Sequence, residues 1–189
     1  RRSSSAASDV YKRQSLFMAK VFQTINDCPK AVIGIINGPT IGGGIGLASV
    51  CDILLAKESA FFCLSEVRLG MAPSVISPFV MQKMSASQAR RYFLTAERFD
   101  ALKAKELGFV HEVYSDTPDE ILGPIVENLL SCGPNAIGEA KKLIQKNLEL
   151  SGNELTQFTA EQIADLRASE EGLEGIASFF EKRDPSYKL

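Results

Sequence analysis

The sequence has few of the residues that most often hold metal ions or bind nucleic acids. It contains one histidine, and none of its four cysteines is paired in a C-x-x-C spacing, so we expect no metal site. Four cysteines in 189 residues also argue against a disulfide framework, and we expect buried, reduced thiols. The formal net charge is -2 and no basic block occurs, which argues against nucleic acid as a partner.

Long apolar runs are absent too, because no stretch reaches the length that a bilayer span needs. The composition, 45% hydrophobic and 23% charged residues, suits one compact domain or a domain with a small helical appendage. We therefore expect no membrane partner and an intracellular location. This would be the cytoplasm in a bacterium or the mitochondrial matrix in a eukaryote.

The first stretch, RRSSSAASDVYKRQ, is polar and serine-rich and shows no periodicity. It lacks the apolar centre of a signal peptide. We expect residues 1–14 to be a non-native or unstructured tail, of the kind that translated adapter sequence produces. On this interpretation the native residues that precede Ser15 are missing from the chain.

Beyond this tail, apolar spacing predicts strands that alternate with helices. Residues 15–26 have the spacing of an amphipathic helix, and the β-branched run at 31–38 is typical of a buried strand. The runs at 53–56, 60–65 and 110–115 also have the character of strands. After about residue 118 the pattern is helical. The alternation favours an α/β fold over a helical bundle.

Three glycines in a row, Gly42 to Gly44, stand where a helix of small residues should begin. A glycine inside a helix costs about 1 kcal/mol relative to alanine, so this run needs a reason in the backbone. One reason is tight packing of the helix on a strand. The other is close approach of a ligand to the amides.

The motifs around these glycines resemble a known family. The segments AVIGIINGPTIGGGIGLASVCDILLAKESAFFCLSEVRLGMAP, YFLTAERFDALKAKELGFVHEV and FFEKRDP have the order and spacing of the crotonase superfamily, the enoyl-CoA hydratases and isomerases. Within it, FCLSEVRLGMAPSVISPFV and RRYFLTAERFD look closest to methylglutaconyl-CoA and isohexenylglutaconyl-CoA hydratases. The resemblance implies a crotonase-like spiral of ββα units. The core, present only in part, would occupy residues 15–117, and a helical oligomerisation or lid region residues 118–189.

The resemblance also assigns roles to residues. The amide of Gly43 would donate to the thioester oxygen of an acyl-CoA, with Gly42 and Gly44 giving the turn room. Glu66 would be the general acid and base beside the double bond. Taken as an isolated motif, S-E-V-R also permits a plain surface ion pair between Glu66 and Arg68.

The chain departs from the family pattern at several positions. Many hydratases carry a second glutamate where this sequence has Gly46, and a lone Glu66 would also serve an isomerase. The loop after Pro73 lacks the usual glycines, and there Ser74 could donate a hydroxyl to substrate or water. Lys182 lies where the family places a lysine near the CoA phosphates of a neighbouring subunit, or it is a solvated lysine at a helix end.

The leading hypothesis is an enoyl-CoA hydratase that adds water to a 2-enoyl-CoA, with a methylglutaconyl-type substrate from leucine or fatty acid breakdown. A Δ3,Δ2-enoyl-CoA isomerase is the first alternative, and a non-catalytic crotonase-fold scaffold or RNA-binding protein is the second. No cofactor is expected beyond the coenzyme A of the substrate, and the family implies a homo-trimer or hexamer. Because the family's second oxyanion donor would precede Ser15, we expect this fragment alone to be inactive.

Overall fold

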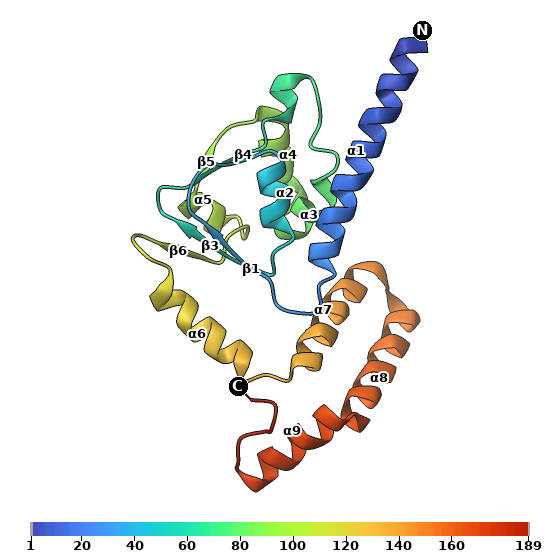
Figure 1. Ribbon diagram of the computed structural model, residues 1–189, viewed down its shortest axis with the longest axis vertical. Helices are drawn as coiled ribbons and strands as arrows, with labels where there is room; N and C mark the ends of the chain where they lie inside the picture. Colours follow the sequence, from blue (N-terminus) through green and yellow to red (C-terminus); the bar gives the residue numbers. More distant parts are fainter. Residues whose placement is uncertain (1, 189) are drawn as a thin grey trace. The chain divides into compact units, whose positions relative to one another are not determined.

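The computed structural model describes residues 2–188, which form two compact units. The first contains the residues before 27 together with 32–121, and the second contains 27–31 together with the residues from 122 onward. The first unit holds these elements in chain order (Figure 1): α1 (Arg2–Asn26), β1 (Ile33–Ile36), β2 (Thr40–Ile41), α2 (Gly43–Ser49), β3 (Ile53–Lys57), β4 (Phe61–Cys63), the 3-10 turn η1 (Glu66–Leu69), α3 (Ser77–Lys83), α4 (Ala86–Thr95), β5 (Phe99–Asp100), α5 (Ala101–Glu106) and β6 (Glu112–Tyr114).

The first four strands of the first unit alternate between two sheets. One sheet has the order β1-β3-β6 and is parallel throughout, with Ile35 beside Leu55. The other has the order β2-β4-β5, with β2 parallel and β5 antiparallel to β4. The chain thus passes through β1, β2 and α2, then through β3, β4 and α3. This repeat confirms the expected α/β spiral of ββα units.

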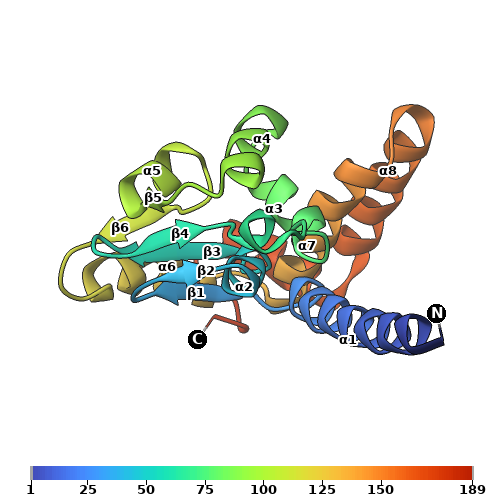
Figure 2. The same cartoon turned by 90° about the horizontal axis from the view of Figure 1, so that it is seen from above.

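Burial of β3 on both faces explains its continuous apolar sequence. Leu54, Leu55 and Ala56 are fully buried, as the central strand of a parallel sheet requires. An aromatic cluster fills the space around β4, where Phe62 stacks on Phe99 with ring centroids 5.4 Å apart. Figure 2 shows α4 and α5 on one side of the strands. These layers place the ends of β2 and β4 side by side.

Residues 2–14 are helical and form the first half of α1, which extends past the strands (Figure 1). The expectation of an unstructured tail is therefore wrong for them. The physical reason is that residues 2–26 contain neither proline nor glycine, so nothing stops the helix that begins in the amphipathic stretch. The tertiary contacts of α1 lie near its end, where Phe22 is buried and packs edge-on against Phe79 with centroids 6.0 Å apart.

Helices make up the second unit. After α6 (Asp119–Leu130), which begins just before the boundary between the units, come α7 (Pro134–Glu149), α8 (Gly152–Ala168) and α9 (Glu170–Glu181). The Gln162 amide on α8 donates to the Glu139 carboxylate on α7 at 2.8 Å. Among the helices that the structure describes, none is long and apolar enough to cross a membrane.

Candidate active site

The triple-glycine turn joins β2 to α2. Gly42 has φ +53° and ψ -118°, a conformation that favours glycine because it has no Cβ. Its N–H donates to the Cys63 carbonyl at the end of β4, at 3.0 Å, so the turn continues the pairing of β2 with β4. Its carbonyl accepts from the Ile45 amide at 2.9 Å, which starts the helix. The backbone therefore requires glycine at position 42.

Gly43 and Gly44 are the first two residues of α2. Amides in the first turn of a helix have no acceptor within the helix, and they carry its partial positive charge. A Cβ built on Gly43 would meet nothing within 4 Å, so the space over this residue is open. A Cβ on Gly44 would lie in ordinary contact with Thr40 Cγ2, at 3.6 Å. Neither glycine is required for packing within the first unit, so the approach of a ligand to the Gly43 amide stays a prediction.

The Glu66 carboxyl lies against this turn. The buried Leu64 and then Ser65 follow β4, and Glu66 begins η1 rather than ending a strand as its sequence context indicated. A Cβ built on Gly42 would be 3.3 Å from Glu66 Oε1 and 3.9 Å from its Cδ. The structure thus places the Glu66 carboxyl beside Gly42, and the roles that the resemblance implied for Gly43 and Glu66 stay predictions.

One oxygen of this carboxyl has no partner. Glu66 Oε2 is buried and accepts no hydrogen bond from the part of the chain that the structure describes. Such groups are rare in native proteins, because an unsatisfied buried polar atom forfeits its hydration. The ion pair that S-E-V-R permits is not formed, since the Arg68 guanidinium donates to the Ala96 carbonyl at 2.7 Å. Glu66 Oε2 is thus an acceptor that the described residues leave unsatisfied.

The loop after Pro73 satisfies its own hydroxyls. Pro73 is buried, and its carbonyl accepts from the Ser77 amide at 2.9 Å. Ser74 is exposed, and its hydroxyl donates to the Ala72 carbonyl at 3.3 Å. No hydrogen bond joins Ser74 to Glu66 in the described residues. Its proposed contact with substrate therefore stays a prediction.

The buried Gly46 lies against two apolar side chains, Ile76 and Phe22, that the sequence did not indicate. A Cβ on Gly46 would lie 2.2 Å from Ile76 Cγ2 and 3.0 Å from Phe22 Cζ. A longer side chain such as glutamate would displace Ile76. The two apolar residues thus occupy the space next to the position where many family hydratases carry their second carboxylate. Both come from elements remote in sequence from Gly46, so only a pairing signal between distant positions could have identified them.

Lys182 ends α9 in a left-handed conformation, with φ +54°, and is exposed. It belongs to the second unit, whereas Gly43 and Glu66 belong to the first. Its contact with CoA phosphates stays a prediction. No cluster of three or more potential metal ligands (His, Cys, Asp, Glu) gathers among residues 2–188.

A sequence profile of the enoyl-CoA hydratase/isomerase family matches residues 4–189. The chain belongs to the enoyl-CoA hydratase/isomerase family. The enoyl-CoA hydratase AFT6-1 of Alternaria alternata is 38% identical over 170 residues, which cover 87% of this chain and 56% of that protein. The crystal structure of an enoyl-CoA hydratase from Shewanella pealeana matches with a TM-score of 0.90 and 40% identity, over 94% of this chain and 67% of that one.

Isomerases are among the relatives of this enoyl-CoA hydratase/isomerase family member as well. The peroxisomal Delta(3,5)-Delta(2,4)-dienoyl-CoA isomerase of Arabidopsis thaliana is 28% identical over 187 residues, which cover 96% of this chain and 66% of that protein. These matches confirm the crotonase superfamily and its fold. The chain spans little more than half the length of AFT6-1, 56% of it.

Proposed function

We propose that the protein is an enoyl-CoA hydratase, which adds water across the double bond of a 2-enoyl-CoA. The observation that carries this proposal is the Glu66 carboxyl: its Oε1 lies beside the turn that presents the Gly43 amide, and its Oε2 is buried without a partner in the described residues. A carboxylate and an oxyanion donor on one acyl group are the two parts that the reaction needs.

In the proposed reaction, the thioester carbonyl accepts a hydrogen bond from the Gly43 amide. The Glu66 carboxylate removes a proton from water as the new C–O bond forms at the β-carbon. The π electrons move to the thioester oxygen, where the amide stabilises the developing negative charge. Loss of such a donor raises the barrier by roughly 3 to 4 kcal/mol. Glu66 then returns the proton to the α-carbon, so water supplies both added groups.

The finer substrate proposal is a methylglutaconyl-type acyl-CoA. Its support is the resemblance of the stretches around Glu66 and Thr95 to glutaconyl-type hydratases. We expect kcat/KM to be higher for 3-methylglutaconyl-CoA than for crotonyl-CoA. A preference for the unbranched crotonyl chain would contradict this finer proposal and leave the hydratase proposal intact.

The decisive experiment is the Glu66→Gln variant of the protein expressed from its whole gene. General acid–base catalysis contributes about 10²- to 10⁴-fold, and we expect a loss of kcat of that size. Formation of the 3-hydroxyacyl-CoA, heavier by one water, is followed by mass spectrometry. Glu58→Gln is the matched control, because Glu58 is exposed in the turn between β3 and β4. Equal rates for the two variants would refute the role of Glu66.

A second candidate function is Δ3,Δ2-enoyl-CoA isomerisation. It is favoured by the packing of Ile76 and Phe22 against Gly46. Because Ile76 and Phe22 close that side, Glu66 would be the lone carboxylate, which suffices to carry a proton from C2 to C4. The sequence similarity to a dienoyl-CoA isomerase supports the same candidate function. Incubation with a 3-enoyl-CoA separates the two. An isomerase gives a 2-enoyl-CoA of unchanged mass and leaves it unhydrated.

A further inference from the structure

One backbone carbonyl, that of Ala96, accepts hydrogen bonds from two neighbouring segments. The Arg68 guanidinium donates to it through Nη2 at 2.7 Å, and the Cys63 thiol donates at 3.2 Å. Ala96 follows the last residue of α4, is fully buried, and has a left-handed backbone with φ +50°. Its own N–H donates to the Tyr92 carbonyl at 3.2 Å, so the residue is held at both ends.

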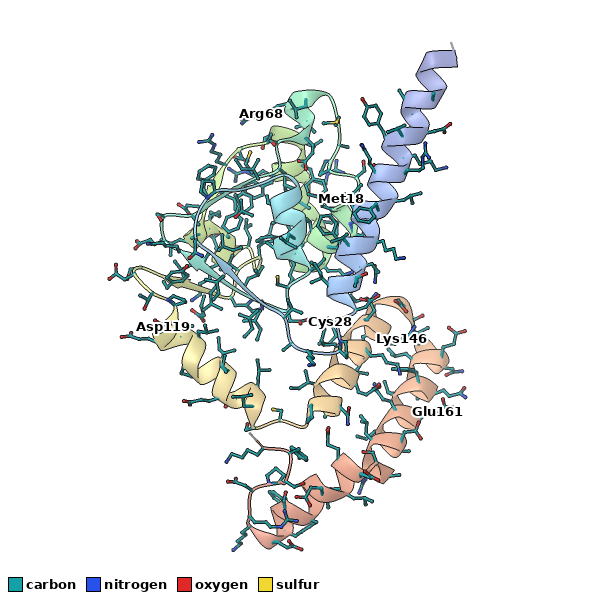
Figure 3. The ribbon with its side chains drawn as sticks, in the orientation of Figure 1. Met18, Cys28, Arg68, Asp119, Lys146 and Glu161 are labelled. Atoms are coloured by element: carbon teal, nitrogen blue, oxygen red, sulfur yellow. The ribbon has the colours of Figure 1, made fainter. Side chains whose placement is uncertain are left out.

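The two donors belong to the two halves of the candidate active site. Arg68 lies in η1, two residues after Glu66, at the edge of the first unit (Figure 3). Cys63 ends β4, and its carbonyl accepts from the Gly42 amide at 3.0 Å. The Ala96 carbonyl thus contacts η1, which carries the Glu66 carboxyl, directly through Arg68. It is linked to the glycine turn through Cys63, whose thiol donates to Ala96 and whose carbonyl accepts from Gly42.

The turn η1 contacts α4, but its side chains are only partly covered. No residue of this turn is buried, and Leu69 is 71% exposed. Its backbone bonds are local: the Gly70 amide donates to Val67 at 3.2 Å, and the Met71 amide to Glu66 at 3.1 Å. The Arg68 side chain, by contrast, reaches another element. A guanidinium at the C-terminal end of a helix such as α4 also complements the partial negative charge there.

We infer that Arg68 is a positioning residue for Glu66, an inference that rests on the proposed function. Docked on the Ala96 carbonyl, Arg68 fixes η1 so that the Glu66 carboxyl lies against Gly42. The same contact keeps the guanidinium away from that carboxyl, whose buried oxygen would otherwise attract a cation two residues away. Arg68 touches neither water nor acyl group in this role, and it acts through Glu66.

The test compares Arg68→Met, Arg68→Lys and the control Arg91→Met. Arg91 lies near the same end of α4 but pairs on the surface with Glu97. Hydrogen exchange at the Gly70 and Met71 amides reports the position of η1, and kcat and KM report its use. For Arg68→Met we expect exchange at these amides about 10-fold faster and kcat about 10- to 100-fold lower, with KM within two-fold. Arg68→Lys keeps the positive charge but lacks the planar guanidinium. Its exchange rates and kcat should lie between those of the wild-type protein and Arg68→Met.

Unchanged exchange at Gly70 and Met71 in Arg68→Met overturns the inference, and so does faster exchange without loss of kcat. Faster exchange over the whole first unit also overturns it, because Arg68 would then support the fold in general. If Arg68→Met does not fold, the same criteria apply to Arg68→Lys. If the wild-type protein converts no enoyl-CoA, the proposed function fails, and exchange alone decides whether Arg68 anchors the turn.

Discussion

Single residues decide how much room the candidate site has, and Gly46 shows this most directly. Its hydrogen takes the place of a side chain that would run into Ile76 and Phe22, so glycine here is a packing requirement. By contrast, glycine at position 42 is a backbone requirement, because its φ is +53°. Glycine is thus required at position 42 by the backbone conformation of the turn, and at position 46 by the packing of α2.

Gly46→Ala should destabilise the protein by about 1–3 kcal/mol through overpacking, because the new Cβ would lie 2.2 Å from Ile76 Cγ2. Urea unfolding followed by circular dichroism measures the change. In an Ile76→Ala background the same substitution should cost clearly less, since the nearest colliding atom is gone and only the Cβ of residue 76 and Phe22 Cζ, each at 3.0 Å, remain. If Gly46→Ala lowers the free energy of unfolding by the same amount in the Ile76→Ala background as in the wild-type protein, the overpacking argument is contradicted.

The surroundings of His111 predict how the free energy of unfolding depends on pH. The Leu54 amide donates to its Nδ1 at 3.0 Å, so the folded state needs a neutral imidazole. Burial, assisted by the Lys83 ammonium, lowers the pKa of His111 below its usual value near 6.5. The unfolded chain therefore binds the proton more readily, and stability should fall as the pH drops through about 6.5.

Because the chain has one histidine, the pH response just below 6.5 can be assigned to it. His111→Asn retains an acceptor but cannot titrate, so it should flatten the stability curve between about pH 6.5 and 5.5. Urea midpoints at a series of pH values give the curve. An equally steep decline in His111→Asn would show that other groups cause it.

At the scale of elements, apolar pattern predicted most strands and helices, and long-range pairing explains the misses. The strands at 33–36, 61–63 and 112–114 fall within the runs that their apolar residues indicated, and the strand at 53–57 extends one residue beyond its run. The two-residue strands β2 and β5 went unpredicted because two residues carry no period. Both exist by pairing with β4. The pairing of β2 with β4 leads directly into the hydrogen bond between the Gly42 amide and the Cys63 carbonyl.

The candidate site was predictable only in part. The expectation that the triple-glycine turn lies near Glu66 came from family resemblance, since spacing alone cannot bring residues from separate turns together. The contacts of Ile76 with Gly46 and of Arg68 with Ala96 span 30 and 28 positions and depend on how helices pack on strands. No local pattern marks such partners, so they became visible only in the structure.

A carboxylate on α9 caps α7 from outside its own helix. The Glu171 oxygens accept from the Asn135 and Ala136 amides at 3.0 and 2.8 Å, and the α7 N-cap residue, Gly133, offers no side-chain oxygen. A Cβ on Gly133 would come within 2.3 Å of Glu171 Oε1, so the close approach depends on glycine. These contacts link the first turns of two helices that lie far apart in sequence.

Glu171→Ala should therefore lower stability by about 1 kcal/mol, the usual cost of losing a cap. Hydrogen exchange should become faster at Asn135 and Ala136 before it changes elsewhere in α7. Glu170→Ala is the matched control, because the neighbouring Glu170 is exposed and caps nothing in α7. Equal effects of the two substitutions would assign the loss to general charge on α9 rather than to the cap.

At the scale of the whole molecule, the two units divide the tasks. The first contains every strand of the described residues and both parts of the candidate site, whereas the second is helical. In the second unit, α9 carries a group of exposed apolar side chains that a solitary globular unit would be expected to cover: Leu173, Ile176, Phe179 and Phe180. This surface favours contact with another protein surface, and the homo-trimer or hexamer that the family resemblance implies stays a prediction.

Substitution of Phe179 and Phe180 by aspartate should reduce the oligomer to smaller species, because each ring is 77% exposed within its own chain. Charges placed there would have to be buried without a partner on assembly. Light scattering after size exclusion measures the mass of the wild-type protein, expected at three or six subunits, and of the double variant. Gln157→Asp, on the exposed surface of α8, adds charge without removing apolar area and should leave the mass unchanged. A wild-type monomer would contradict the proposed assembly, and an unchanged mass in the double variant would move the interface away from α9.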